Sequence, residues 1–280
     1  MRIIITLYIA FIAFSGFYSC KESGHSTSSE NMEISRKDST GEASVTVLSY
    51  NIHHSNPPSR PDYIDTAAIA EVIKKSDADI VGLQEVDVYT ERSGTELHMA
   101  GKLAELSGMD YFYFSKAIDY KGGAYGTAIL SKYPLSDTLT INLPSAEGTE
   151  PRVLSVATVT LDNGYKFHFA NTHLDYTDAA NNLDQAERVA QYFGESDLPV
   201  ILTGDLNVVP ESKTITYLDQ HFVRSCINAC SYTSPADSPR RTIDYIMYKG
   251  MNDFTVEQHR VLRESYASDH LPVKAVLKME

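Results

Sequence analysis

Apolar, strand-like segments along this chain repeatedly deliver a polar residue that can bind a metal ion or carry a proton. Taken singly, each such residue could be a capping asparagine, a turn aspartate or a surface histidine. The recurrence argues for a site, because ligand sites in layered α/β structures form where strand ends and their loops meet. The residues concerned are Asn51, Glu85, His173, Asp205, Asn207, Asp244, Asp269 and His270.

The segments between these residues predict more strands than helices. Helical spacing of apolar residues indicates helices at 65–76, 96–108 and 179–193. β-branched, aromatic or short apolar runs predict strands at 45–52, 77–86, 111–115, 126–131, 138–143, 153–161, 165–174, 198–207, 242–248, 254–262 and 271–277. Several strands follow one another directly, which breaks a simple strand–helix alternation. The pattern therefore predicts an α/β fold with two packed sheets and helices outside them.

The first 44 residues have a different composition from the rest of the chain. Arg2 precedes an apolar stretch at 3–18 and then Cys20, which is typical of a secretory signal with a lipoprotein processing site. The stretch is short for a membrane-spanning helix, which needs roughly 20 apolar residues. We expect a signal peptide at 1–19, a flexible polar tether at 20–44 and one domain at 45–280. An uncleaved anchor and plain secretion are the alternatives.

Charge and donor chemistry restrict the function. The formal net charge is −13, which argues against stable capture of nucleic acid by a basic surface and suits a site that collects divalent cations. Oxygen ligands such as Glu85, Asp269 and the amide of Asn51 are those preferred by Mg²⁺ or Mn²⁺. Zinc more often takes cysteines or clustered histidines. A hard cation with a base and hydrogen-bond donors is suited to attack of water on phosphorus.

These motifs together resemble those of the endonuclease/exonuclease/phosphatase superfamily, which has the deoxyribonuclease I-like fold. The matching stretches, in the family's order, are LSYNIHH, GLQEVD, YGTAILSKYPL, NTHLDY, TGDLNVVP, RTIDYIMY and SDHLPV. The resemblance runs from about Val45 to Leu277. It implies a four-layer α/β/β/α sandwich, with two mainly antiparallel or mixed sheets flanked by helices and the site on one edge between the sheets.

The resemblance also implies a role for each site residue. Glu85 is the principal metal ligand, Asn51 helps to hold metal or phosphate, and Asp269 is a second carboxylate on the metal side. His270 is the base that activates water, oriented by Asp244. His173 and Asn207 donate hydrogen bonds to the phosphoryl oxygens. Asp205 is either a second base or the residue that holds the water.

Further stretches are similar to bacterial relatives of a GPI-anchor remodelling domain and of neutral sphingomyelinases. In such relatives Arg152 would face substrate, with a solvated strand arginine as the alternative. His53 and Asp175 would lie near the site, or have a structural role. We therefore expect a monomeric, metal-dependent phosphodiesterase or phosphatase acting on lipid-linked or small phosphate esters. It would be exported and anchored to a membrane, periplasmic or at the cell surface, through lipidated Cys20. A secreted nuclease and a catalytically dead binding module are the other hypotheses.

Two further cysteines, Cys226 and Cys230, lie four residues apart. In an exported protein this pair could close a small disulfide loop. A buried, reduced pair is the alternative, and the sequence does not choose between them.

Overall fold

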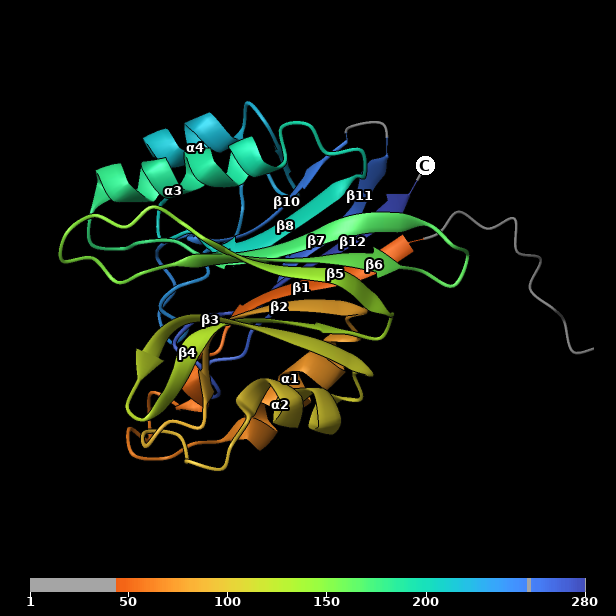
Figure 1. The fold of residues 1–280 in the computed structure, drawn as a ribbon. Coiled ribbons are helices and arrows are strands. Elements are labelled where there is room, and N and C mark those ends of the chain that lie inside the picture. Colours follow the sequence, from red (N-terminus) through yellow and green to blue (C-terminus); the bar gives the residue numbers. More distant parts are fainter. Residues whose placement is uncertain (1–43, 251–252, 280) are drawn as a thin grey trace, which may run out of the picture. The chain divides into compact units, whose positions relative to one another are not determined.

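Two six-stranded sheets run through residues 44–250 and 253–279, the part of the chain that this computed structural model describes (Figure 1). The predicted signal peptide lies outside the described residues. So does the predicted tether, except for Ser44, which begins the first strand. Among the described residues, no helix has both the length and the apolarity needed to span a bilayer.

The first sheet has the strand order β11-β12-β1-β2-β4-β3. Its strands are β1 (Ser44–Asn51), β2 (Ile80–Val88), β3 (Tyr111–Tyr120), β4 (Gly123–Ser131), β11 (Phe254–Val261) and β12 (Val273–Met279). The β1–β2 pair is parallel and the other pairs are antiparallel. The last strand of the chain, β12, thus lies inside the sheet, directly beside the first strand.

The second sheet has the strand order β5-β6-β7-β8-β10-β9. Its strands are β5 (Leu135–Asn142), β6 (Val153–Thr160), β7 (Lys166–His173), β8 (Val200–Asp205), β9 (Val223–Arg224) and β10 (Asp244–Lys249). Here the β7–β8 pair is parallel and the others are antiparallel. Both sheets are therefore mixed, as expected from the sequence.

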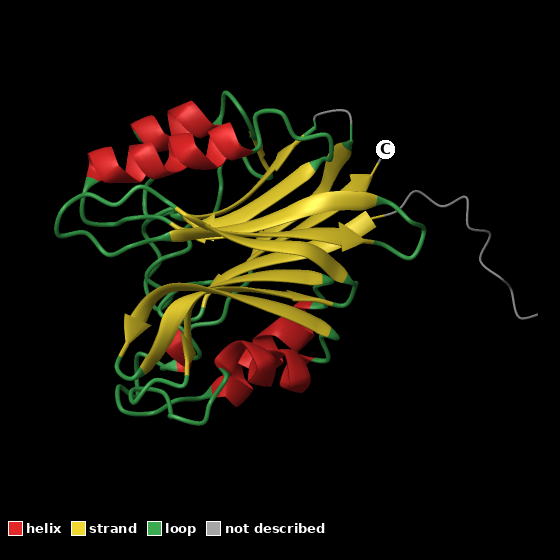
Figure 2. Ribbon diagram, viewed as in Figure 1, coloured by secondary structure: helices red, strands yellow, loops and turns green. Residues whose placement is uncertain are grey.

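Helices cover the outer face of each sheet, so that the predicted four-layer sandwich is confirmed (Figure 2). The helices are α1 (Thr66–Ser76), α2 (Met99–Ser107), α3 (Ala179–Tyr192) and α4 (Lys213–Leu218), and a short 3-10 turn, η1 (His53–Ser55), follows β1. Asp178 caps α3 by accepting hydrogen bonds from two backbone amides of its first turn. Gly108 ends α2 in the left-handed conformation, which glycine adopts without a Cβ penalty.

The inner faces of the sheets pack through apolar side chains at one end and a polar bridge nearer the site. Val47, Phe169 and Ala275 belong to the apolar part. In the bridge, the Gln84 amide of β2 donates to Asn171 Oδ1 of β7 at 2.6 Å. The sheets approach closely there, because a Cβ on Gly82 would lie 2.1 Å from a side-chain oxygen of the other sheet. This close approach brings the strand ends of the two sheets within reach of one another.

The two cysteines after β9 form a disulfide. Cys226 and Cys230 have their Cα atoms 5.8 Å apart, within the usual range for a bridged pair. The structure thus decides between the two alternatives that the sequence left open, and it places a closed small loop on the path from β9 to β10.

Candidate functional site

One asparagine links the two sheets at the edge where their strands end. Asn51 is the last residue of β1, and the parallel strand β2 brings Glu85 beside it. The Asn51 amide donates to Glu85 Oε1 and to Asp205 Oδ2, both at 3.0 Å. Asp205 belongs to the other sheet, so a single amide group connects the predicted metal ligand to a carboxylate across the sandwich.

Asp205 is the central residue among the site residues that the second sheet provides. It ends β8, where the parallel strand β7 places His173 opposite it and the antiparallel strand β10 places Asp244 opposite it. The Asp205 side chain is 1% exposed. Its Oδ1 accepts from the backbone N–H of Asn207 at 2.9 Å, and its Oδ2 lies 3.6 Å from His173 Nε2. Three strands therefore converge on one buried carboxylate.

His270 and Asp244 form the pair that the sequence predicted. His270 Nδ1 lies 2.9 Å and 3.0 Å from the two carboxylate oxygens of Asp244. On the other side of the ring, Nε2 lies 3.8 Å from Asp205 Oδ2. The segment before β12 is held in place by Ser268, whose hydroxyl donates to the backbone carbonyl of Asn51 at 2.7 Å. The Asp-His pair near the chain's end is thus fixed against the first strand.

Burial and neighbouring charges set the protonation of this pair. Burial alone would lower the pKa of His270, but Asp244 and Asp205 raise it to about 10. Burial, together with the negative charge of Asp244, raises the pKa of Asp205 to about 7. The arrangement therefore favours a cationic His270 beside a carboxylate that binds a proton more readily than an exposed aspartate.

Arg152 is not a solvated strand arginine, because it is 4% exposed and lies against the site. Its Nη1 lies 3.0 Å from His173 Nδ1 and 3.0 Å from Glu150 Oε1. A guanidinium can only donate, so His173 Nδ1 is the acceptor. The ring proton of neutral His173 then sits on Nε2, which faces Asp205. Burial, and secondly the Arg152 charge, hold the pKa of His173 well below its usual range.

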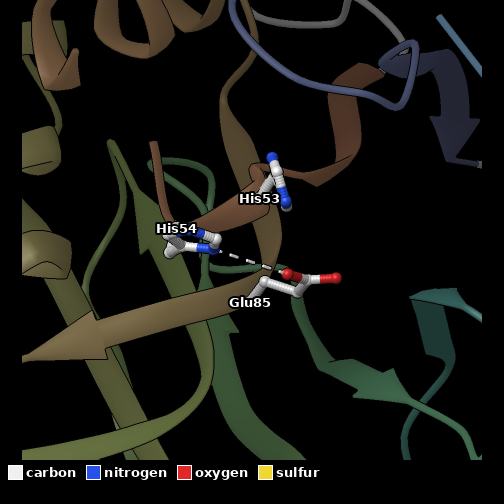
Figure 3. A group of neighbouring side chains, drawn as sticks. All are labelled: His53, His54 and Glu85. Carbon is white, nitrogen blue, oxygen red and sulfur yellow. Dashed lines mark ion pairs between the residues drawn. The ribbon is translucent and has the colours of Figure 1, made fainter. Parts of the chain in front are cut away.

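Glu85 projects into the same edge next to the turn that follows β1. Figure 3 shows His53 and His54 beside it, with His54 Nδ1 3.8 Å from Glu85 Oε2. Burial by itself would raise the pKa of Glu85, but the His54 ring and the Asn51 amide hold it well below its usual range. Glu85 is therefore a carboxylate that stays ionised, as a metal ligand must be.

Asp269 and Asn207, two predicted site residues, do not make the contacts that their predicted roles suggest. Asp269 is half-buried, and its carboxylate lies 3.4 Å from the Ser268 hydroxyl, whose proton goes to the Asn51 carbonyl. Among the described residues no hydrogen bond joins its carboxylate to Glu85 or Asn51. The Asn207 amide donates to the backbone carbonyl of Leu174 at 3.0 Å. Asp269 and Asn207 therefore lie at the site edge without contacting Glu85.

Asp175 has a structural function in this edge. Its carboxylate accepts from the backbone and hydroxyl of Thr177, both at 2.7 Å, and from the Asn181 amide. These bonds fix the connection between β7 and α3. Of the two residues for which the sequence left a choice, Asp175 organises a loop, whereas His53 lies beside Glu85.

Sequence reasoning did not assign His54 or Glu150 to the site. His54 is adjacent to His53 in the motif NIHH, so a signal was present, but adjacent side chains normally point in different directions. Here both residues have left-handed backbone angles, with φ of 45° at His53 and 42° at His54. Glu150 lies two residues before Arg152 and pairs with its guanidinium. The left-handed turn has no signature in a single sequence, whereas the spacing of Glu150 and Arg152 was available in it.

Among the described residues, two groups of side chains have donor atoms within 4.8 Å of one another, close enough to share a metal ion. The groups are His53, His54 and Glu85, and Asp205, Asp244 and His270. The second group is occupied by its own ion pair and hydrogen bonds. The first contains the carboxylate that stays ionised, and so it fits a divalent cation better.

Fold and site together define a class of enzymes that hydrolyse phosphoric esters: two mixed sheets packed face to face, with carboxylates and imidazoles meeting at one edge. Residues 48–270 match the Endonuclease/Exonuclease/phosphatase family. The chain belongs to this family, whose members are phosphoesterase hydrolases that depend on a divalent metal. The resemblance seen in the sequence is confirmed.

Relatives span most of the chain. The Escherichia coli (strain K12) protein YbhP, described as uncharacterized, is 26% identical over 86% of this chain and 99% of its own length. An endonuclease/exonuclease/phosphatase structure from Beutenbergia cavernae has a TM-score of 0.72 and 24% identity, covering 84% of this chain and 72% of that one. A mannosyl-6-phosphatase from Bacteroides thetaiotaomicron has a TM-score of 0.67 and 23% identity, covering 83% and 99%.

Proposed function

We propose that this chain is a phosphodiesterase or phosphatase that uses Mg²⁺ or Mn²⁺ to hydrolyse lipid-linked or small phosphate esters. One observation carries the proposal: the buried Asp205 carboxylate faces two imidazoles and is joined through the Asn51 amide to Glu85. This places groups suited to proton transfer next to groups suited to a metal ion. A dead binding module would need neither in this arrangement.

Glu85 and Asn51 are the residues that would hold the ion. Glu85 offers an ionised carboxylate, and the Asn51 amide oxygen is a neutral oxygen donor, although it now accepts from the backbone of His53. When bound, the ion would neutralise negative charge that develops on the phosphoryl oxygens. Asp269, the third predicted metal-side residue, could act through Ser268 and remains a prediction.

The protein's own groups divide the proton work between them. If His270 were neutral, its proton would sit on Nδ1, which faces Asp244, and the lone pair of Nε2 would face the Asp205 carboxylate. Two acceptors would then face each other, so either His270 or Asp205 must carry one more proton. We assign that proton to His270, which Asp244 stabilises as a cation. Asp205 therefore takes the role of base that the sequence resemblance implied for His270. Asp205 then accepts the proton of the attacking water as the water oxygen bonds to phosphorus. The phosphorus–oxygen bond to the alcohol breaks, and the departing oxygen takes a proton from solvent.

The imidazoles and the arginine then serve as donors to the phosphoryl group. His270 and His173 each present Nε2 toward the same carboxylate oxygen, where a phosphoryl oxygen would approach. Arg152 holds His173 in the tautomer that donates from Nε2. Positioned donors of this kind stabilise charge developing in the transition state.

A small or lipid-linked substrate fits the charge of the chain better than a nucleic acid. The formal net charge of −13 gives duplex DNA little basic surface to bind. A structural relative carries the name mannosyl-6-phosphatase, which supports including a sugar phosphate among the substrates to be tested. Export and lipidation of Cys20 would place the enzyme, as a monomer on its tether, next to membrane lipids. Mass spectrometry of the mature N-terminus tests that part, and an unmodified Cys20 would contradict it.

A substrate panel tests the proposed activity. Purified protein would be assayed with bis-p-nitrophenyl phosphate, p-nitrophenyl phosphate, mannose 6-phosphate, sphingomyelin, phosphoinositides, plasmid DNA and RNA, with Mg²⁺, with Mn²⁺ and with EDTA. We expect metal-dependent turnover of small or lipid esters, which Asp205→Asn lowers by about 10³–10⁴-fold. Faster cleavage of DNA or RNA than of any other substrate would favour the nuclease hypothesis. No turnover of any ester would favour the binding module.

A further inference from the structure

We propose that His53 and His54 supply imidazole nitrogens to the ion held by Glu85, so that this site selects a transition metal such as Mn²⁺ over Mg²⁺. The inference rests on the proposed metal-dependent function and specifies the ion. It alters the sequence-based expectation, which considered oxygen ligands alone. Imidazole is a ligand of transition metals, whereas Mg²⁺ prefers oxygen donors and water.

The donor atoms are spaced for a shared ion. One ring nitrogen of each histidine and one carboxylate oxygen of Glu85 all lie within 4.8 Å of one another, and their side chains gather on one side of the turn (Figure 3). His54 Nδ1 is 3.8 Å from Glu85 Oε2. That distance is too long for a hydrogen bond. It falls within the roughly 3–4 Å that separates two donors each about 2.1 Å from one ion.

Among the described residues, His54 Nδ1 has no other partner. The residue is 8% exposed, and within this part of the chain its Nδ1 is buried without a hydrogen bond. A buried polar atom left unsatisfied costs about 1–3 kcal/mol, so such atoms are rare unless they have a function. The unpartnered nitrogen lies on the side of the ring that faces the carboxylate. A bound ion would satisfy it.

His53 is prepared as a ligand by its backbone neighbour. Its Nδ1 lies 2.8 Å from the carbonyl oxygen of Asn56, which can only accept, so Nδ1 carries the ring proton. Nε2 then keeps its lone pair free for a metal. Metal-binding histidines commonly donate their second ring N–H to a carbonyl or carboxylate, which fixes the tautomer and the ring orientation.

The backbone is held in a costly conformation that brings the two rings together. His53, His54 and Ser55 have φ of 45°, 42° and 61°, and Glu85 has φ of 60°. Left-handed angles at residues other than glycine cost of order 1 kcal/mol or more each and persist where surrounding contacts enforce them. Ser55 is fully buried against the helical layer and its hydroxyl contacts Met99. The turn is therefore fixed from behind, with the rings directed at Glu85.

Direct metal binding tests the inference. Isothermal titration would measure Mn²⁺ and Mg²⁺ affinities for the wild type, His54→Ala, His54→Gln, His53→Ala and the double alanine variant. His221→Ala, which removes an exposed histidine beside Tyr217, is the matched control. Spin-echo EPR of the Mn²⁺ complex would detect directly bound nitrogen-14. Thermal unfolding without metal would confirm that each variant is folded. If His54→Ala does not fold, His54→Gln can replace it, because glutamine keeps most of the side-chain volume.

We expect nitrogen coupling in the wild type that is lost in the double variant. Each single change should weaken Mn²⁺ by about tenfold or more, with Mg²⁺ affected less than about threefold, and His221→Ala should change neither. Equal losses for both metals, or Mn²⁺ bound without nitrogen coupling, would overturn the inference while leaving metal-dependent hydrolysis intact. Nitrogen-coupled Mn²⁺ in a protein that hydrolyses no ester would overturn the proposed function instead and leave the metal site standing.

Discussion

The two sheets of this protein are built alike but supply different chemistry. Each contains a single parallel strand pair, β1–β2 in the first sheet and β7–β8 in the second. The carboxyl ends of both pairs meet at the same edge. The first pair and its following turn deliver Asn51, Glu85 and two histidines, a set suited to a metal ion. The second pair delivers His173 and Asp205, a set suited to proton transfer.

The difference follows from what packs against each pair. In the first sheet a left-handed turn brings imidazoles onto a carboxylate that stays ionised. In the second sheet the antiparallel strand β10 adds another carboxylate, Asp244, opposite Asp205. Burial, and secondly the negative charge of Asp244, raise the pKa of Asp205, so Asp205 binds a proton more readily, and His270 becomes a cation between the two carboxylates. Residues suited to metal binding and residues suited to proton transfer thus lie side by side at one edge of the sandwich, and the Asn51 amide connects them.

We call Asn51, Glu85, His53 and His54 the first half of the site. Removing the metal should have the largest effect on turnover, because it disables this half entirely. Excess EDTA should lower turnover by about 10⁴-fold, since electrostatic stabilisation by an ion is worth several kcal/mol and each 1.36 kcal/mol is tenfold. Mn²⁺ added back should restore the rate. Glu85→Gln, assayed beside it, should reproduce the loss without lowering the melting temperature. Full turnover in excess chelator would remove the metal half of the comparison.

The second half of the site consists of His173, Asp205, Asp244 and His270. Asp205→Asn should disable this half and leave the first half intact. The amide cannot take a proton from water, so we expect turnover to fall by about 10³–10⁴-fold, the upper part of the range for a general base. Affinity for Mn²⁺ should change less than about threefold, which titration calorimetry can check. If metal affinity fell in parallel with turnover, the two halves would not be separable.

Changes at His270 and Asp244 should have smaller and graded effects. His270→Ala should lower turnover by about 10²–10³-fold, because it removes a charged donor to the phosphoryl group. Asp244→Asn should cost about tenfold, since it weakens the charge and orientation of the imidazole without emptying the site. Initial rates on p-nitrophenyl esters would measure both. An Asp244→Asn variant slower than His270→Ala would mean that Asp244 acts on more than the ring.

The sequence predicted much of this arrangement because a strand can be identified from a short run of apolar residues. Apolar runs such as 198–207 end in residues that form the site, and the end of the helix predicted at 96–108 agrees with the C-cap of α2 at Gly108. The six-residue helix α4 was not predicted, since one and a half turns carry too few residues to show a helical period. The polar bridge between Gln84 and Asn171 was also missed, because each residue reads alone as an exposed amide.

The missing parts of the site have different causes. His54 points at Glu85 only because the turn after β1 takes left-handed angles, which depend on tertiary contacts that no short window contains. Glu150 lies two residues before Arg152, so this pair was visible in the sequence but was not considered. Asp269 shows the converse case. The resemblance implied that Asp269 is a second carboxylate on the metal side, but among the described residues no hydrogen bond joins its carboxylate to Glu85 or Asn51.

The smallest expected effect on activity concerns the disulfide next to the second half. Replacing Cys226 and Cys230 by serine should lower the free energy of unfolding by about 2 kcal/mol, the loop-entropy value for so short a loop. Turnover should change less than about twofold, because Thr233 anchors the site independently. Its hydroxyl accepts from the backbone N–H of Asp244 at 3.3 Å, and its carbonyl accepts from Leu271 at 2.7 Å.

Denaturant unfolding and initial rates on the same preparations would test this last prediction, with reduction of the wild type as the control. Reduced wild type and the double serine variant should unfold alike and hydrolyse alike. Thr233→Val is the matched change: it removes the anchoring hydroxyl but keeps the disulfide, so it should lower turnover more than loss of the disulfide does. If losing the disulfide slowed turnover as much as losing the hydroxyl, the loop itself would position Asp244. The second half would then depend on the redox state of its surroundings, whereas the first would not.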